Sequence, residues 1–78
     1  MIYVYVIKSK KKNYRYTGIT NNVDRRLKQH NGGYGISTKS FAPFDLVLEE
    51  GYPNYKDARA REKFLKSGAG RKFLDSLK

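Results

Sequence analysis

The sequence predicts an α+β fold in which a small three-stranded sheet is flanked by helices. Short runs of β-branched and aromatic residues near the start and the middle of the chain have the length of strands. Between and after them come helical segments, the two longer ones each preceded by an asparagine that can cap a helix. The predicted order is β-β-α-β-α-α, within a single domain that comprises residues 1–78.

The first two strands form a predicted hairpin. Ile2 to Ile7 make the first strand, a basic loop runs from Lys8 to Asn13, and Tyr14 to Ile19 make the second strand. Because side chains alternate along a strand, one face receives Ile2, Val4 and Val6, and the other receives Tyr3, Tyr5 and Ile7. Gly18, near the end of the second strand, indicates a bend or a close approach of another group to the backbone.

The first helix is predicted to begin at Asn21 or Asn22, either of which can cap its free amide groups. Val23 and Leu27 stand four residues apart and form its apolar anchor. The helix is predicted to end at the two glycines after Asn31, because glycine readily takes the conformation that stops a helix.

A loop from Tyr34 to Pro43 leads to a third strand, Phe44 to Glu49, whose alternation directs Phe44, Leu46 and Leu48 inward. The second helix is capped by Asn54 and runs to about Lys66. Gly68-Ala69-Gly70 is predicted to break it before a short final helix that carries Phe73, Leu74 and Leu77. A chain this short hides a modest share of its surface, so we expect a core of only one thin layer.

Charge is the strongest compositional signal. The 78 residues include 17 Lys and Arg against 7 acids, for a net charge of +10. This favours a polyanionic partner such as nucleic acid over a merely solubilising surface. The chain has no cysteine, no signal-peptide pattern and no apolar run that could span a bilayer, so we expect a cytoplasmic protein without a membrane partner.

Five residues are candidates for chemistry. Glu62 borders the apolar stripe of the second helix, where a carboxylate needs a partner: a metal ion, or an ion pair with Arg59, Arg61 or Lys63. Arg26 and His30 lie four apart on the first helix and share a face, which suits phosphate binding and proton transfer, or else a solvated surface. Tyr5 and Tyr16 lie on neighbouring strands, where they act either as a base with a pKa lowered by cations or as ordinary packed aromatics.

Taken in order, these residues resemble the GIY-YIG nuclease family. Val4-Tyr5-Val6 stands for the GIY motif and Tyr16-Thr17-Gly18 for YIG, and both keep the tyrosine. Arg26 follows the motif glycine by eight residues, His30 takes a position of histidine or tyrosine, and DARAREKFLK is similar to the helix with the family's acidic metal ligand. The loop Ser37-Thr38-Lys39 up to Pro43 resembles the small stand-alone members.

The resemblance implies a metal-dependent DNA endonuclease, a phosphodiester hydrolase that is structure-selective and serves repair or recombination. Glu62 would hold one Mg²⁺ or Mn²⁺, Tyr5 or Tyr16 would be the general base, Arg26 would brace the phosphate, and His30 would relay a proton or hydrogen-bond the tyrosine. The alternative is a catalytically weak or silent nucleic-acid-binding module of the same fold. A basic RNA-binding protein is a further rival, although the sheet aromatics typical of that class are not clear here.

Seven cations are predicted to contact DNA phosphates without reading the sequence. They are Lys10, Lys11, Lys12, Arg15, Arg25, Lys28 and Lys39. The sequence shows no appended DNA-binding domain, so targeting would come from this surface or from a protein partner.

Overall fold

The computed structural model describes residues 1–34 and 38–77 and has the predicted α+β class. Its elements are β1 (Ile2–Ser9), β2 (Arg15–Thr20), α1 (Val23–Asn31), the short 3-10 helix η1 (Lys39–Phe41), β3 (Phe44–Tyr52), α2 (Tyr55–Lys66) and α3 (Gly68–Ser76). Across these ranges the strands form one antiparallel sheet with β1 in the centre, between β2 and β3. Ser37, part of the predicted loop, lies outside the described residues.

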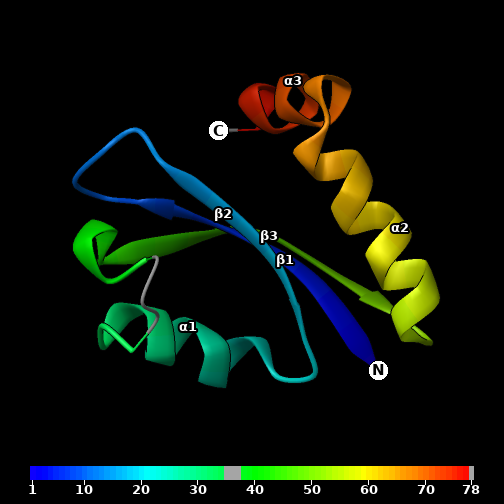
Figure 1. Ribbon diagram of the computed structural model, residues 1–78, viewed down its shortest axis with the longest axis horizontal. Helices are drawn as coiled ribbons and strands as arrows, with labels where there is room; N and C mark the ends of the chain where they lie inside the picture. Colours follow the sequence, from blue (N-terminus) through cyan, green and yellow to red (C-terminus); the bar gives the residue numbers. More distant parts are fainter. Residues whose placement is uncertain (35–37, 78) are drawn as a thin grey trace.

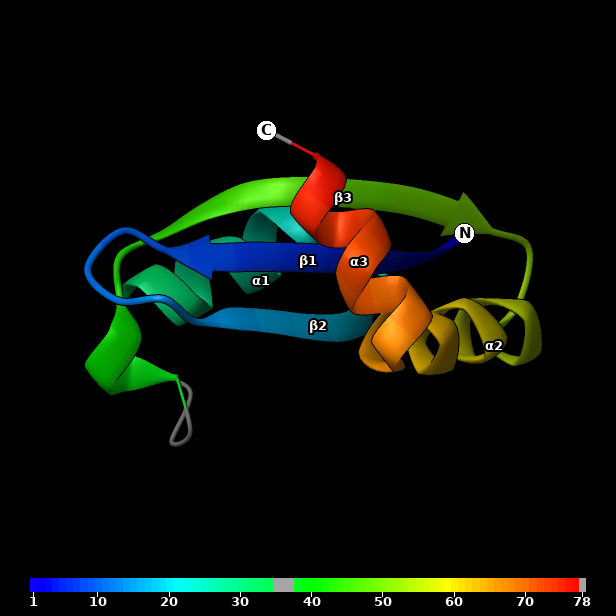
Figure 2. The same ribbon diagram turned by 90° about the horizontal axis from the view of Figure 1, so that it is seen from above.

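The sheet separates two layers of helix. Figures 1 and 2 show α1 against one face and α2 with α3 over the other. The prediction of a core with one thin layer was therefore wrong. Alternation along β1 sends Val4 and Val6 to the α2/α3 face and Tyr5 and Ile7 to the α1 face, and each pair is buried in a separate apolar cluster. Both faces of the central strand are covered, which explains its continuous apolar run.

The third strand corrects one prediction. Phe44 packs on the α1 face and Leu48 packs against the α2/α3 cluster, but Leu46 is 41% exposed. The pairing with β1 passes from Ile7–Leu46 to Val6–Leu48, so Val47 is an extra residue and forms a bulge. A bulge shifts the alternation by one position, and residues on its two sides no longer share a face.

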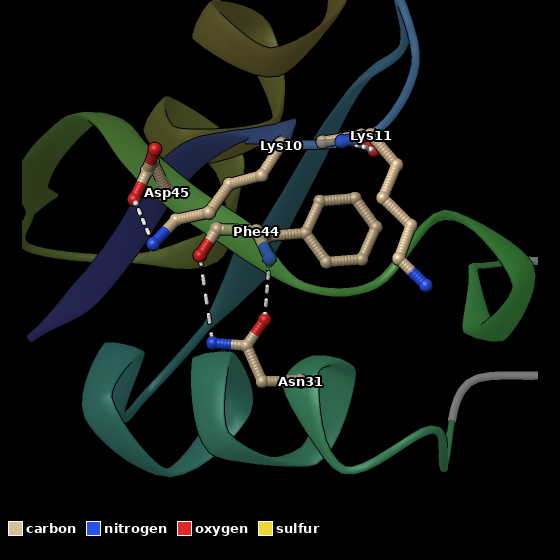
Figure 3. A network of polar contacts seen from close by, with 6 residues as sticks. Lys10, Lys11, Asn31, Phe44 and Asp45 are labelled. Atoms are coloured by element: carbon tan, nitrogen blue, oxygen red, sulfur yellow. Dashed lines mark hydrogen bonds and ion pairs between the residues drawn. The ribbon is translucent and has the colours of Figure 1, made fainter.

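The first helix is fixed at both ends by asparagine side chains. Asn22 Oδ1 accepts a hydrogen bond from the Arg25 backbone amide (3.0 Å), the predicted cap. At the other end, Asn31 Oδ1 accepts from the Phe44 amide (2.6 Å), and its Nδ2 donates to the Phe44 carbonyl (3.5 Å). Figure 3 shows Asn31 holding α1 against the start of β3. These contacts set where Arg26 and His30 lie relative to the sheet.

The second and third helices meet at Ser67. Asn54 caps α2 as predicted, by accepting from the Asp57 amide (2.9 Å). Gly68-Ala69-Gly70 was predicted to interrupt the helices, yet these residues form the first turn of α3, capped by Ser67 Oγ (3.2 Å from the Gly70 nitrogen). A side chain at Gly70 would collide with the backbone of Phe64 and Leu65, so glycine here permits close packing of α3 on α2.

Candidate active site

Tyr5 lies at the centre of the candidate site. It is 1% exposed on β1 and opposite Gly18 in the register with β2. A Cβ at Gly18 would lie 2.7 Å from the Tyr5 hydroxyl oxygen and 3.0 Å from Cε2 of Tyr16. The predicted close approach at Gly18 is therefore confirmed, because the missing side chain leaves room for the Tyr5 hydroxyl.

A buried chain of polar groups leads away from that hydroxyl. Tyr5 Oη lies 3.0 Å from Nε2 of His30, and Nδ1 of His30 lies 2.9 Å from Oγ1 of Thr38. His30 is 3% exposed and Thr38 is 1% exposed. From the sequence, Thr38 was placed in a loop, and no role was predicted for its side chain. A buried histidine needs a hydrogen-bond partner for each ring nitrogen. Had the burial of His30 been foreseen, this need would have directed attention to polar residues of the loop, such as Thr38.

Both titratable members of this chain are neutral at ordinary pH. Burial, assisted by the positive charge of Arg26, holds the pKa of His30 below its usual 6.5. Burial raises the pKa of Tyr5 above 10.0, and although Arg26 opposes that shift, it does not overcome it. The expectation that cations lower the pKa was therefore wrong for Tyr5, because loss of hydration outweighs the neighbouring charge.

Tyr16 and Arg26 border the same chain. The Tyr16 ring centroid lies 6.2 Å from that of Tyr5 and 5.0 Å from that of His30. Arg26 donates to Gln29 Oε1 (3.0 Å), and its hydrogen bonding with Tyr5 raises the pKa of its guanidinium, which remains charged. The structure thus gathers four of the five candidate residues on the α1 face, next to Gly18.

Glu62 approaches from the opposite layer, on α2. Its side chain is 19% exposed and its Oε2 lies 3.3 Å from Nζ of Lys66, one turn further along the helix. That ion pair differs from the ones considered in the sequence, since Arg61 pairs with Glu50 instead (2.8 Å). The negative charge of Glu62 contributes to raising the pKa of Tyr5, so the two side chains interact electrostatically.

The donor set decides which metal the site could hold. Among the described residues, no three His, Cys, Asp or Glu side chains gather as metal ligands. Glu62 is a partly buried carboxylate, and in its ion pair with Lys66 only the lysine is exposed. A single carboxylate fits Mg²⁺ or Mn²⁺ that keeps most of its waters, and does not fit a Zn²⁺ or Ca²⁺ cage built by the protein.

The seven cations predicted to contact DNA are spread over several surfaces. Lys10 pairs with Asp45 (3.3 Å), as Figure 3 shows, and Arg15 pairs with Asp75 (2.7 Å). Lys12 lies over the ring of Phe41, 5.2 Å from its centroid. The others are exposed: Lys11 in the hairpin loop, Arg25 and Lys28 on α1, and Lys39 in η1.

The fold and the tyrosine-centred site define the class of protein: the chain belongs to the GIY-YIG family. A family model described as the GIY-YIG catalytic domain matches residues 1–73. The family is one of nucleases.

More particular similarity is to proteins named UPF0213. The UPF0213 protein of Clostridium perfringens is 42% identical over 67 residues, which cover 85% of this chain and 71% of that protein. The one from Staphylococcus haemolyticus is 41% identical over 66 residues, covering 83% of this chain and 79% of the relative. The solution NMR structure of the UPF0213 protein of Bacillus halodurans is similar with a TM-score of 0.57 and 38% identity, covering 100% of this chain and 86% of that one.

No helix in the part of the chain that the structure describes is long and apolar enough to cross a membrane.

Proposed function

We propose that this protein is a metal-dependent DNA endonuclease that hydrolyses a phosphodiester bond at the Tyr5–Gly18 site. The observation that carries the proposal is the buried chain Tyr5–His30–Thr38, with Arg26 at its exposed end. The glycine opposite Tyr5 leaves room at its hydroxyl, and the neutral His30 gives that hydroxyl a neighbour able to accept its proton.

The proposed proton path runs through the hydrogen-bonded residues Tyr5 and His30, with Thr38 at its inner end. The attacking water gives a proton to Tyr5 Oη while the Tyr5 hydroxyl proton moves to Nε2 of His30, 3.0 Å away. This path needs no standing phenolate, and so it is compatible with the raised pKa of Tyr5. Thr38 would accept the hydrogen bond of Nδ1–H, which keeps Nε2 free to receive the proton. Tyr5 is preferred to Tyr16 as the base because His30 can accept from it directly.

The remaining residues would hold the phosphate. The Arg26 guanidinium stays charged and would brace the non-bridging oxygens through charge-assisted hydrogen bonds. Tyr16 would orient the water or the phosphate. As the new phosphorus–oxygen bond forms, the bond to the 3′ oxygen breaks, and that oxygen takes a proton from solvent.

Glu62 would hold one Mg²⁺ or Mn²⁺. The chemistry that such an ion supplies is stabilisation of negative charge on a phosphate oxygen and on the leaving 3′ oxygen. The Lys66 side chain that pairs with Glu62 is 57% exposed, so it can turn to solvent and leave the carboxylate to a divalent ion.

The exposed cations support DNA as the substrate, since they offer phosphate contacts without base readout. Such contacts favour selection of DNA structure, such as flaps or branches, and a task in repair or recombination.

A cleavage assay tests the proposal. Supercoiled, single-stranded, flap and branched DNA would be incubated with native protein in Mg²⁺, in Mn²⁺ and with chelator. We expect metal-dependent cutting that Glu62→Gln abolishes, with DNA affinity kept or increased because a negative charge is removed. Asp45→Asn, which removes an exposed carboxylate that pairs with Lys10, is the control and should cut normally.

Two results would contradict the proposal. Salt-sensitive DNA binding without cutting on any substrate would favour the binding module. Loss of folding in Glu62→Gln would show that this carboxylate has a structural role, and Mn²⁺ binding followed by paramagnetic resonance would then decide whether it is a ligand.

A further inference from the structure

A basic groove lies between the edge strand β2 and the junction of α2 with α3. Of the residues predicted for the site or for DNA contact, it includes Arg15 and Tyr16 and no others. Its volume is about 580 Å³. Arg15 of β2, Lys66 of α2 and Arg71 of α3 line it together. Figure 2 shows the α2–α3 junction beside β2. A strand near the start of the chain and the junction of two consecutive helices thus bring three cations to one concave surface.

The charge of this groove distinguishes it from its neighbour. No carboxylate lines it among the described residues, although Asp75 and Glu62 pair with Arg15 and Lys66 at its margins. The adjacent groove, of about 510 Å³, is lined by Lys8, Arg15, Asp45 and Asp75 together with apolar side chains. Its charges balance, whereas the first groove stays positive even with Arg15 and Lys66 in ion pairs, because Arg71 has no carboxylate partner among the described residues.

The groove is continuous with the candidate active site. Tyr16 lines it, and the ring of Tyr16 lies 5.0 Å from that of His30. Lys66, on another side of the groove, is the ion-pair partner of Glu62. The groove therefore shares Tyr16 with the candidate site and reaches Glu62 through Lys66.

We propose that this groove, through Lys66 and Arg71, binds the phosphodiester backbone of a single DNA strand leading from the cleavage site. The proposal rests on the proposed nuclease function and adds the substrate class, a DNA with an unpaired strand such as a flap. A groove of this volume is in the range that holds small ligands and has space for a short stretch of one strand. A groove lined by cations can follow the backbone of a single strand, and here Lys66 and Arg71 supply that charge.

Binding is measured with chelator present, so that the result does not depend on cutting. The probes are a fluorescent oligothymidylate and a hairpin duplex, followed by anisotropy over a range of salt. Arg71→Gln should weaken oligothymidylate binding about three- to tenfold, the loss of one charge-assisted contact. The slope of log K against log salt should fall by about 0.7, the value for one phosphate contact on a single strand.

Lys72→Gln is the matched control. It removes the same charge from the next residue of α3, which is exposed and does not line the groove. We expect it to change oligothymidylate affinity by less than about twofold, because its side chain does not line the groove and makes no direct phosphate contact there. Both variants should keep the native circular dichroism spectrum, because both side chains are exposed.

Three outcomes would overturn the proposal: an unchanged affinity in Arg71→Gln, an equal loss in Lys72→Gln, or an equal loss of duplex binding. The first two would leave the nuclease proposal intact if native protein cuts DNA. Conversely, a specific Arg71 effect without any cutting by native protein would keep the groove and reject the nuclease.

Discussion

The α2/α3 face of the sheet is packed with aliphatic side chains, whereas the α1 face is aromatic and carries hydrogen bonds. Val4, Val6 and Leu65 belong to the first cluster, whose buried members are all aliphatic among the described residues. Tyr5 belongs to the second, where its hydroxyl contacts His30. Strand β1 supplies both clusters, since successive side chains point to opposite faces.

The difference shows how a domain this small separates stability from chemistry. Apolar burial on one face can hold the fold together. The other face can then retain a buried phenol and imidazole, whose desolvation costs free energy unless they are hydrogen-bonded. If this division holds, a change on the α2/α3 face should alter stability and leave the His30 hydrogen bonds unchanged.

The largest expected effect is that of Leu65→Ala, in the aliphatic cluster. Leu65 is 1% exposed, and its truncation should lower the free energy of unfolding by about 2–5 kcal/mol through lost burial and the cavity that remains. Urea unfolding measures the loss, and nitrogen NMR signals of the His30 ring should stay as in the native protein. A changed tautomer signal would show that the two faces are coupled.

Gly18→Ala, at the point where the Tyr5 hydroxyl approaches the backbone of β2, is expected to have a smaller effect on the free energy of unfolding. The new Cβ would meet the Tyr5 hydroxyl and the Tyr16 ring, and overpacking of this kind costs about 1–3 kcal/mol. The His30 ring signals should shift, because Tyr5 has to move.

Gly68→Ala is the control for that substitution, since a Cβ at Gly68 meets nothing within 4 Å. It should be neutral or slightly stabilising. Equal losses in the two variants would mean that the cost at Gly18 comes from the strand itself and not from the tyrosine hydroxyl.

The smallest expected effect is the pH dependence that His30 and Tyr5 of the α1 face produce. The native state keeps His30 neutral, with a lowered pKa, whereas the unfolded chain protonates it below about pH 6.5. This contribution to stability is present above pH 6.5 and is lost as the pH falls toward the folded pKa. At the other extreme, the raised pKa of Tyr5 makes stability fall as the pH rises above 10.0.

His30→Gln serves as the reference for the acid side, because carboxylates also titrate as the pH falls. The difference in unfolding free energy between native protein and this variant, measured by urea unfolding at several pH values, isolates the histidine. A difference that does not vary below pH 6.5 would show that His30 accepts a proton in the folded state as easily as in the unfolded chain.

Local signals predicted much of the fold correctly. Asn22 and Asn54 cap their helices because a cap depends only on residues a few positions apart. Alternation placed Tyr5 correctly on the face opposite Val4. The errors arose where two segments meet: Leu48 leaves the face of Phe44 because a bulge appears when β3 pairs with β1, and Gly70 serves the close packing of α3 on α2.

The candidate site divides in the same way. Residue order placed Tyr5, Tyr16, Arg26 and His30 together as candidates, and the structure gathers them on one face. The partners of these residues could not be read from the order. Thr38 reaches His30 from a loop, and burial reverses the expected direction of the pKa shift of Tyr5.

By itself, then, the sequence determined the elements, the alternation that assigns side chains to faces, and the excess positive charge, since each depends on residue type and local spacing. Only the tertiary structure decided which groups are desolvated, which polar atoms meet, and that Arg15, Lys66 and Arg71 share one groove. The physical reason is that hydration and hydrogen bonding depend on neighbours brought together by packing, and those neighbours lie far apart in the chain.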